Sequence, residues 1–400
     1  MVEAREQTAK VVQLPVLDPW LLCAGLFLLA LGLLMVASAS MPIADDKTGQ
    51  PFYYLIRQGI ASGLGLIMAL VAFQVPANTW NRWGPVLLLA AMGLLILVLI
   101  PGIGKEVNGS TRWISLGAMN IQVSEIAKLF ALVYIAGYLQ RHGDALRTSI
   151  MAMIRPMMVL AVLAMLLLIE PDFGAAVVLM ATALGMVFLA GVNIWQFAAL
   201  QGCTITAMSM LLYFSEYRRA RLINFLDPWE DPFNKGFQLT QSLIAIGRGE
   251  LFGVGLGASI QKLFYLPEAY TDFLFAILAE ELGLIGVMVV IGLYAVIVWR
   301  AFKISANAEQ LGMRFSAYLA FGIGLWFGIQ ALVNMGVNMG VLPTKGLTLP
   351  LMSYGGSSLV IMCVTLSILL RIDLEARSEA LPVMEDVARR PAGSVSEGAV

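Results

Sequence analysis

The sequence predicts an all-α polytopic integral membrane protein with ten transmembrane helices, cytoplasmic termini and one long outer loop. Of the 400 residues, 59% are hydrophobic and 13% are charged, and the mean hydropathy is +0.83. An ordinary soluble domain has about 25% charged residues, which excludes that class. The apolar residues also gather in runs close to the roughly 20 residues that cross the hydrocarbon of a bilayer.

Ten apolar runs are predicted to span the membrane. They cover residues 19–41, 55–75, 84–101, 122–140, 153–170, 173–191, 195–214, 273–299, 313–338 and 350–370. Residues 1–18 are predicted to be an N-terminal tail, 19–371 the membrane domain and 372–400 a C-terminal tail. Short polar segments connect most runs, so we expect neighbouring helices to pack antiparallel.

The distribution of basic residues predicts the orientation. An even number of spans puts both termini on one side, and that side holds 13 of the 25 Lys and Arg residues. Six of the other 12 lie in the 57-residue loop 215–271, whereas the positive-inside rule concerns mainly residues close to span ends. With that loop set aside, the ratio of 13 to 6 predicts cytoplasmic termini and a periplasmic loop 215–271.

Composition argues against several classes of function. The net charge is −1 and no arginine-rich block is present, so nucleic acid is not an expected partner. The three cysteines all fall in apolar runs, which disfavours a disulfide framework or a cysteine metal site. His142 is the single histidine, so a histidine metal cluster and histidine acid–base chemistry are not expected.

Four polar clusters interrupt the hydrophobic pattern, and all four fall on the predicted outer side. The first is NGSTRWISLG, residues 108–117, in which Arg112 is either an interfacial anchor or a cation directed at a phosphate. The second is SEIAKL, residues 124–129. Here Glu125 and Lys128 share a helix face and are expected to pair. Because charges inside a membrane helix are costly, we expect the pair to face a wet cavity, and the alternative is a purely structural ion pair.

The other two clusters flank later spans. FQLTQSLIAIGRGELFGVGLG, residues 237–257, predicts an interfacial helix followed by a glycine-rich loop, with Arg248 near the headgroups. In LPTKGLTLPLMSYGGSS, residues 342–358, Lys345 lies between two prolines that disfavour regular helix. Such backbone is tolerated at membrane depth where it lines a cavity. The alternative is a connecting loop with a snorkelling lysine.

Asp272 is the strongest candidate for chemistry. It closes the long polar loop at the mouth of an apolar run, in YLPEAYTDFLFAILAEELG, residues 265–283. A carboxylate placed there requires a partner or a function. Together with the cations Arg112, Lys128 and Lys345, this acid suits an anionic lipid-linked substrate. A transferase acting on a lipid diphosphate needs positive charge for the leaving group and a base for the attacking hydroxyl.

Two further patterns predict helix contacts. Gln330, Asn334 and Asn338 are spaced by four residues, which stacks three amides on one helix face. That face is expected either to hydrogen-bond neighbouring helices or to line a polar cavity. The Gly59-x-x-x-Gly63 and Gly336-x-x-x-Gly340 spacings predict close approaches between helices.

Together these motifs resemble the SEDS family of shape, elongation, division and sporulation proteins, over nearly all of the membrane region. The form LPTKGLTLP is most similar to the division branch. A small departure is Val123, where proline often stands in the family. The resemblance implies a ten-helix peptidoglycan glycosyltransferase that polymerises lipid II at the division septum of the inner membrane.

The resemblance also implies roles for individual residues. Asp272 matches the family's essential aspartate and is expected to be the general base, with Lys128 orienting it and Glu125 positioning Lys128. The substrate-binding candidates are Arg112, Lys345 and Arg248. No metal ligand is predicted, although a carboxylate beside a diphosphate is compatible with a divalent cation.

The implied partners are a class B penicillin-binding transpeptidase of the FtsI type and the regulators FtsQ, FtsL and FtsB. Two other functions remain open from the sequence. One is a lipid II flippase, since a polar cavity between helices could pass a headgroup across the bilayer. The clustering of the unusual residues on the outer side disfavours it, but Glu280 and Glu281, expected about 12 to 13 Å deeper in the membrane than Asp272, keep it open. The other is a non-catalytic scaffold that recruits the transpeptidase.

Overall fold

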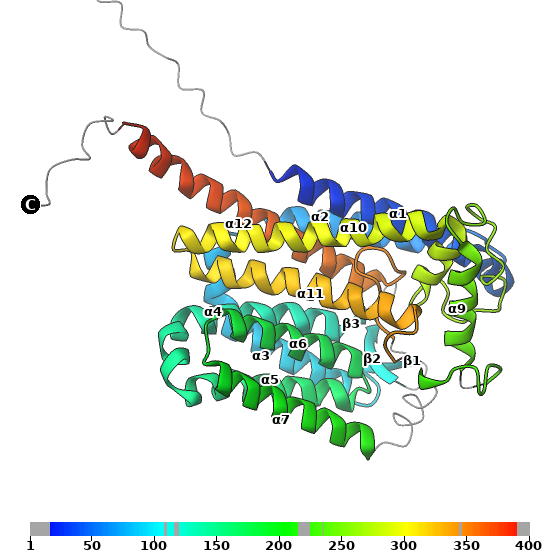
Figure 1. Cartoon of the computed structure of the whole chain (residues 1–400), viewed down its shortest axis with the longest axis horizontal. Helices are drawn as coiled ribbons and strands as arrows, with labels where there is room; N and C mark the ends of the chain where they lie inside the picture. The colour runs from blue at the N-terminus through cyan, green and yellow to red at the C-terminus, as the bar shows by residue number, and fades with distance from the viewer. Residues whose placement is uncertain are drawn as a thin grey trace, which may run out of the picture.

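The protein is an elongated bundle of helices in the computed structural model, which describes residues 17–107, 110–115, 120–214, 225–234, 236–343 and 346–389. Figure 1 shows the long helices running along one common axis, with both ends of the described chain at the same end of the bundle. The long helices are α1 (Pro19–Thr48), α2 (Tyr53–Gln74), α3 (Ala77–Val98), α4 (Val123–Thr148), α5 (Ile150–Ile169), α6 (Phe173–Leu189), α7 (Ile194–Tyr213), α10 (Leu274–Gln310), α11 (Arg314–Asn338) and α12 (Gly356–Arg389).

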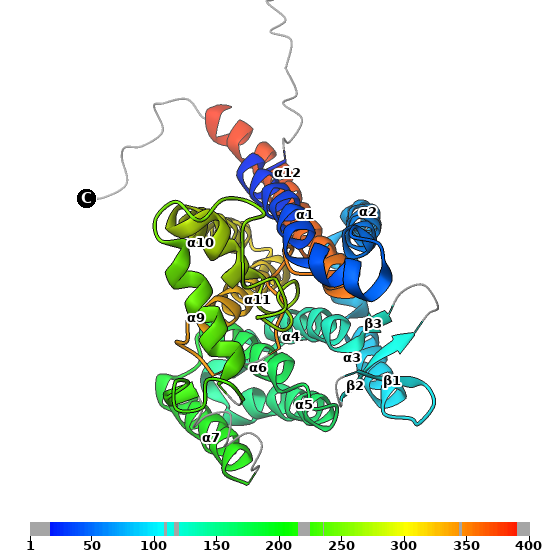
Figure 2. The same ribbon diagram turned by 90° about the vertical axis from the view of Figure 1, so that its right-hand side faces the viewer.

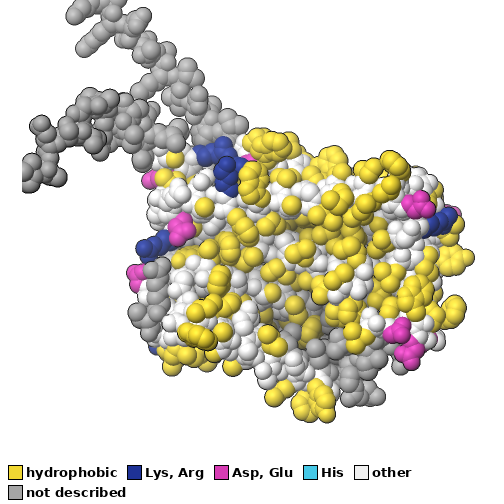
Figure 3. Space-filling view, in the orientation of Figure 1, with side chains coloured by type: hydrophobic (Ala, Val, Ile, Leu, Met, Phe, Trp, Pro, Cys, Tyr) yellow, Lys and Arg dark blue, Asp and Glu magenta, His cyan; other side chains and the backbone are white. Residues whose placement is uncertain are grey.

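Each predicted apolar run coincides with one of these helices. Within the described chain, eight helices are long and apolar enough to cross a membrane, and α6 is a shorter apolar helix of 17 residues. Figure 3 shows a broad hydrophobic band on one face, with charged side chains gathered toward the two ends of the bundle. The polytopic helical membrane fold is therefore confirmed, and the number of ten crossings stays a prediction.

The helix boundaries follow local chemistry. Asp18 caps α1, because its side chain accepts a hydrogen bond from the Leu21 amide at 3.1 Å and Pro19 occupies the first turn. The last predicted run, 350–370, begins too early, since α12 starts only at Gly356 and then continues to Arg389. Part of that extension is supported by an ion pair between Arg371 and Glu375, spaced by four residues.

A small antiparallel sheet, which the sequence analysis did not predict, lies between α3 and α4. Its strands are β1 (Gly104–Val107), β2 (Ser110–Ser115) and β3 (Asn120–Gln122), in the order β1-β2-β3. Trp113 on the central strand is opposite Lys105 on one side and Gln122 on the other. Pairing of this kind satisfies backbone polar groups in a segment too short to form a span.

The amphipathic helix expected in 237–257 is present as α9 (Phe237–Gly249). Figure 1 shows α9 running across the bundle axis, and Figure 2 shows it on the same end as the sheet. We call this the outer end, in line with the predicted orientation.

The loop after α9 packs against α10 where that helix is interrupted at Gly283. Gly283 leaves the helical conformation, with φ 66° and ψ −165°, so neighbouring backbone groups of α10 lose their helical partners. The loop replaces them: the amides of Val254 and Gly255 donate to the carbonyls of Glu280 and Glu281 at 2.9 and 3.1 Å. A Cβ at Gly253, where φ is +80°, would clash with the Glu281 carbonyl. The glycine-rich pattern therefore serves this backbone contact.

The glycine pair on α2 was interpreted incorrectly. Within the described chain, nothing lies within 4 Å of a Cβ placed at Gly59 or Gly63. The close contact is made instead by Gly65, where a Cβ would lie 3.1 Å from Sγ of Cys363 on α12. Spacing alone does not say which face of a helix meets a neighbour.

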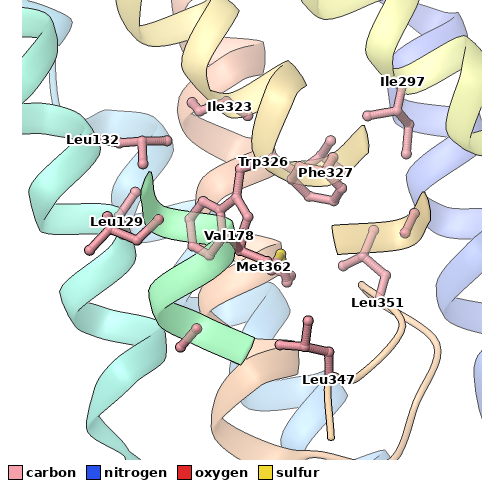
Figure 4. Packing of buried hydrophobic residues seen from close by; sticks show 14 of the residues in the cluster. Leu129, Leu132, Val178, Ile297, Ile323, Trp326, Phe327, Leu347, Leu351 and Met362 are labelled. Carbon is pink, nitrogen blue, oxygen red and sulfur yellow. The ribbon is translucent and has the colours of Figure 1, made fainter. Parts of the chain in front are cut away.

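The hydrophobic core joins the helices beneath the outer end. Figure 4 shows Trp326 and Phe327 of α11 among residues of several other elements. The labelled neighbours include Leu129, Val178, Leu347 and Met362, all buried. Since Trp326 is fully buried, this core holds α11 firmly against α4 and α12.

Candidate active site at the outer end of the bundle

Asp272 lies two residues before α10 and is half-buried. Its backbone carbonyl accepts hydrogen bonds from the side-chain amides of Asn334 at 2.9 Å and Asn338 at 3.0 Å. Its carboxylate faces Gly346, because a Cβ placed on that glycine would lie 3.0 Å from Oδ2 of Asp272. The backbone of this candidate base is therefore fixed by α11, while the carboxylate borders a non-helical loop.

The stacked amides of α11 organise the site. Asn334 also donates to the Leu347 carbonyl at 2.6 Å, and Gln330 donates to the Thr348 carbonyl at 3.0 Å. Asn338 accepts from the Ala276 amide at 3.2 Å, which satisfies a donor in the first turn of α10. Of the two alternatives from the sequence, the structure supports hydrogen bonding between segments. The amide row joins α10, α11 and the loop before α12.

Lys128 and Glu125 form the ion pair expected from their spacing. Nζ of Lys128 lies 2.9 Å from Oε1 of Glu125 and 2.9 Å from Oε1 of Gln330. Nζ also lies 5.0 Å from the centre of the Trp326 ring, a cation–π distance. Trp326 in turn donates to Gln330 Oε1 at 2.8 Å.

The expectation that this pair faces a wet cavity was wrong for this conformation. Lys128 is 0% exposed and Glu125 is 3% exposed. The buried ammonium is compensated by a carboxylate, an amide oxygen and an aromatic face, which lowers the cost of its desolvation. Lys128 and Asp272 are thus linked through one face of α11, because Gln330 contacts the lysine and the next two amides hold the aspartate carbonyl.

Glu280 and Glu281, which left the transport alternative open, hold the loop that leads to Asp272. Both carboxylates are buried. Glu281 pairs with Lys262 at 2.8 Å and lies 2.7 Å from the Ser38 hydroxyl of α1. Glu280 accepts from the Ser259 hydroxyl and from the Ile260 amide at 3.1 Å. These contacts explain why two acids are buried at this depth, and no polar path across the membrane is needed to explain them.

Arg112 is engaged in contacts that anchor the sheet. From β2, its guanidinium donates to the carbonyls of Glu170 at 3.2 Å and Pro171 at 2.6 Å, in the connection between α5 and α6. Nη1 also lies 3.8 Å from Oδ1 of Asp172. With a further hydrogen bond to the Ser110 hydroxyl at 3.2 Å, three of its five N–H donors are engaged. Arg112 therefore holds β2 to the connection between α5 and α6, a contact that neither alternative from the sequence described, and its role toward a substrate stays a prediction.

A buried acid beside Arg112 was missed by the sequence analysis. Glu170 is 0% exposed, and neither of its carboxylate oxygens has a hydrogen-bond partner within the described chain. Burial, followed by the nearby Asp172 carboxylate, raises the pKa of Glu170 to about 8, while Arg112 acts in the opposite direction. The carboxyl is therefore mostly protonated at neutral pH. Nothing in its sequence context distinguishes it from a solvated acid at a helix end.

Of the two remaining substrate-binding candidates, the structure describes Arg248 but not Lys345. Arg248 at the end of α9 pairs with Glu280 at 3.3 Å, and its side chain is 40% exposed. It can therefore still meet a ligand. Lys345 lies outside the described residues, although its neighbour in the chain, Gly346, lies beside Asp272.

The fold and the site together define a polytopic helical membrane protein with a half-buried acid and a buried cation linked at one end of the bundle. The family model described as "Cell cycle protein", which covers FtsW, RodA and SpoVE, matches residues 19–378. The chain belongs to this family, the SEDS proteins. The family prediction made from the motifs is confirmed.

Individual relatives agree with this assignment. The chain is 59% identical over 359 residues to the probable peptidoglycan glycosyltransferase FtsW of Thioalkalivibrio sulfidiphilus, covering 90% of each chain. It is 55% identical over 360 residues to the protein of the same name from Nitrosococcus halophilus, covering 90% of this chain and 93% of the other. The predicted similarity to the division branch is therefore confirmed.

Solved structures share the fold. A chain of a peptidoglycan synthase complex that coordinates polymerization and crosslinking aligns with a TM-score of 0.73 at 29% identity, covering 91% of this chain and 98% of the other. The rod shape-determining protein RodA of Thermus thermophilus aligns with a TM-score of 0.65 at 28% identity, covering 90% and 97%.

Proposed function

We propose that the protein is a peptidoglycan glycosyltransferase that polymerises lipid II during septal wall synthesis in the inner membrane. The observation that carries the proposal is the position of Asp272, whose backbone is fixed by Asn334 and Asn338 while its carboxylate borders the loop at Gly346. Catalytic groups held by surrounding hydrogen bonds keep the geometry that proton transfer requires. The names of the FtsW relatives support the same reaction.

In the proposed reaction, the 4-hydroxyl of the GlcNAc of one lipid II attacks the anomeric carbon of the lipid-linked chain. A glycosidic C–O bond forms, and the bond from that carbon to the diphosphate oxygen breaks. Asp272 takes the hydroxyl proton, and the lipid diphosphate leaves with the bonding electrons. Arg248 and Lys345 are the candidates for stabilising the diphosphate, with Arg112 holding the neighbouring sheet.

Lys128 and Glu125 act in this proposal as positioning residues. The ammonium binds Gln330, which lies on the same face of α11 as the amides that hold Asp272. Removing Lys128 is expected to leave Glu125 as an unpaired buried carboxylate and to disturb the start of α10 through α11. Lys128→Met should therefore shift the pH profile of polymerisation as well as lower its rate.

The proposed partner is a class B penicillin-binding transpeptidase of the FtsI type, regulated by FtsQ, FtsL and FtsB. The alignment with a chain of a peptidoglycan synthase complex supports such an assembly. If the protein were instead a non-catalytic scaffold, it would bind the same partner, and neither this binding nor wall synthesis would require Asp272.

The decisive experiment is gel-resolved polymerisation of labelled lipid II by the purified chain with its transpeptidase, comparing wild type with Asp272→Asn. The transpeptidase must itself lack glycosyltransferase activity. Strands from wild type and none from a folded, partner-binding Asp272→Asn complex would establish the assignment. Equal polymerisation by both would remove Asp272 as base, and no strands from either intact complex would favour flipping or scaffolding.

A further inference from the structure

Three tyrosine rings from separate segments meet beside Asp272. Tyr54 belongs to the first turn of α2, Tyr270 precedes Asp272 by two residues, and Tyr354 lies in the loop before α12. The ring of Tyr54 lies 4.7 Å from that of Tyr270 and 5.3 Å from that of Tyr354, between centroids, and the latter two are 5.5 Å apart. All three residues are half-buried, so this tyrosine cluster borders the surface.

Backbone and amide contacts hold the cluster together. The Tyr354 amide donates to the Tyr270 carbonyl at 3.0 Å. Gln58, one turn after Tyr54 on α2, donates to the Ser353 carbonyl at 3.1 Å and accepts from the Gly355 amide at 3.4 Å. An interfacial tyrosine that only anchors a helix needs no such mutual fixation. The arrangement instead has the rigidity of a binding surface.

The cluster presents neutral hydroxyls beside one cation. Burial, and then a hydrogen bond with Tyr54, raise the pKa of Tyr270. Burial likewise raises the pKa of Tyr354, while Arg57 acts in the opposite direction. The phenols of Tyr270 and Tyr354 therefore remain protonated at neutral pH. Arg57 is exposed, with its guanidinium carbon 5.1 Å from the centre of the Tyr53 ring, so it adds a positive charge at the edge of the cluster.

We propose that the tyrosine cluster is a saccharide-binding platform next to the catalytic carboxylate. Aromatic faces pack against the C–H face of a pyranose ring, while hydroxyl groups and a nearby cation meet its polar and anionic substituents. The inference rests on the proposed glycosyltransferase function. The ligand class is a β-1,4-linked N-acetylhexosamine saccharide, presented either by lipid II or by the growing strand.

The position along the chain fits such a subsite. Two residues of extended chain span at most about 7 Å, so the backbone that carries Tyr270 lies within about 7 Å of the backbone that carries Asp272. A saccharide held there would be neighbour to the reacting sugar. The platform would therefore affect binding of substrate or retention of product more than the proton transfer itself.

The first test measures binding without catalysis. The full-length protein in nanodiscs is titrated with tetra-N-acetylchitotetraose and followed by saturation-transfer NMR. Tyr54→Leu and Tyr354→Leu should weaken binding by about threefold to tenfold, since each removes one aromatic contact. Tyr54→Phe and Tyr354→Phe keep the rings and lose only the hydroxyl contacts, so they should weaken binding less than the Leu variants do. Tyr265→Leu is the matched control, an exposed tyrosine of the same loop outside the three rings.

The second test locates the source of the saccharide. In the polymerisation assay, a raised KM for lipid II in the Leu variants identifies the lipid-linked sugar as ligand. Shorter strands at an unchanged KM identify the growing strand. Either result supports the platform. Leu variants that melt as wild type, bind the oligosaccharide equally and make normal strands at a normal KM would overturn it.

A third measurement is independent of variant folding. In deuterated protein that is protonated only at tyrosine, saturation of the ring protons should reach the sugar C–H protons. Absence of transfer would overturn the proposal even if the Leu variants fail to fold. The wild-type protein could also bind the oligosaccharide through the cluster and yet make no strands. That result would support the platform and refute the glycosyltransferase assignment, so the two proposals can fail separately.

Discussion

The ion pair between Glu281 and Lys262 gives a sharp test of how the loop before Asp272 is held. The two charged atoms are 2.8 Å apart, and the side chains are 0% and 7% exposed. Lys262 also donates to the Ser38 hydroxyl at 2.9 Å, so the pair joins the loop to α1 as well as to α10. Water has little access to replace either partner.

Glu281→Gln keeps the shape of the side chain and removes its charge. The Lys262 ammonium is then buried without a counter-charge, a change that costs about 3–5 kcal/mol of stability. Replacing both residues, as Glu281→Leu with Lys262→Met, removes the two charges together and is expected to cost less than the sum of the corresponding single changes. The loop also carries Asp272, and a displacement of about 1 Å in a catalytic group lowers a rate by about 100-fold.

The assay is denaturant or thermal unfolding of the purified protein in one detergent, with lipid II polymerisation measured on the same samples. The set contains Glu281→Gln, Glu281→Leu, Lys262→Met and the double variant. Glu379→Gln, an exposed acid on α12 far from the loop, is the control. Wild-type stability in Glu281→Gln would refute the reasoning, as would a double variant whose loss equals the sum of its two single changes.

Three further predictions follow from the site. Asn338→Leu removes one of the two acceptors of the Ala276 amide and one of the two side-chain amides that donate to the Asp272 carbonyl, so unfolding should be easier by about 1–3 kcal/mol and kcat should fall more than KM rises; unchanged kcat would contradict this. Arg112→Lys keeps the charge but not the bonds to the two loop carbonyls, so stability should fall by about 1–3 kcal/mol, and wild-type unfolding would refute the anchor role. Glu170 holds a proton in the folded state that the unfolded chain releases, so its raised pKa should make stability fall as pH rises from about 4.5 to about 8. Glu170→Gln should flatten that dependence in melting curves, and parallel wild-type and variant curves would count against it.

Several features were accessible from sequence because they depend on residues close together in the chain. Runs of apolar residues predicted where helices lie, and the spacing of Glu125 and Lys128 predicted their pairing. The amide row on α11 was recognised by its period of four residues. What these amides bind was not predictable, because Gln330 meets Lys128 from a segment 202 residues away.

The sequence by itself thus determined a polytopic helical membrane protein, its family and an acid at the start of α10. Only the tertiary structure decided that Arg112 anchors a sheet, that Glu280 and Glu281 hold a loop, and that three tyrosines meet beside Asp272. The physical reason is that hydropathy and helical period are properties of neighbouring residues. The partner of a buried charge or ring depends instead on which helices pack together and on where a helix such as α10 breaks.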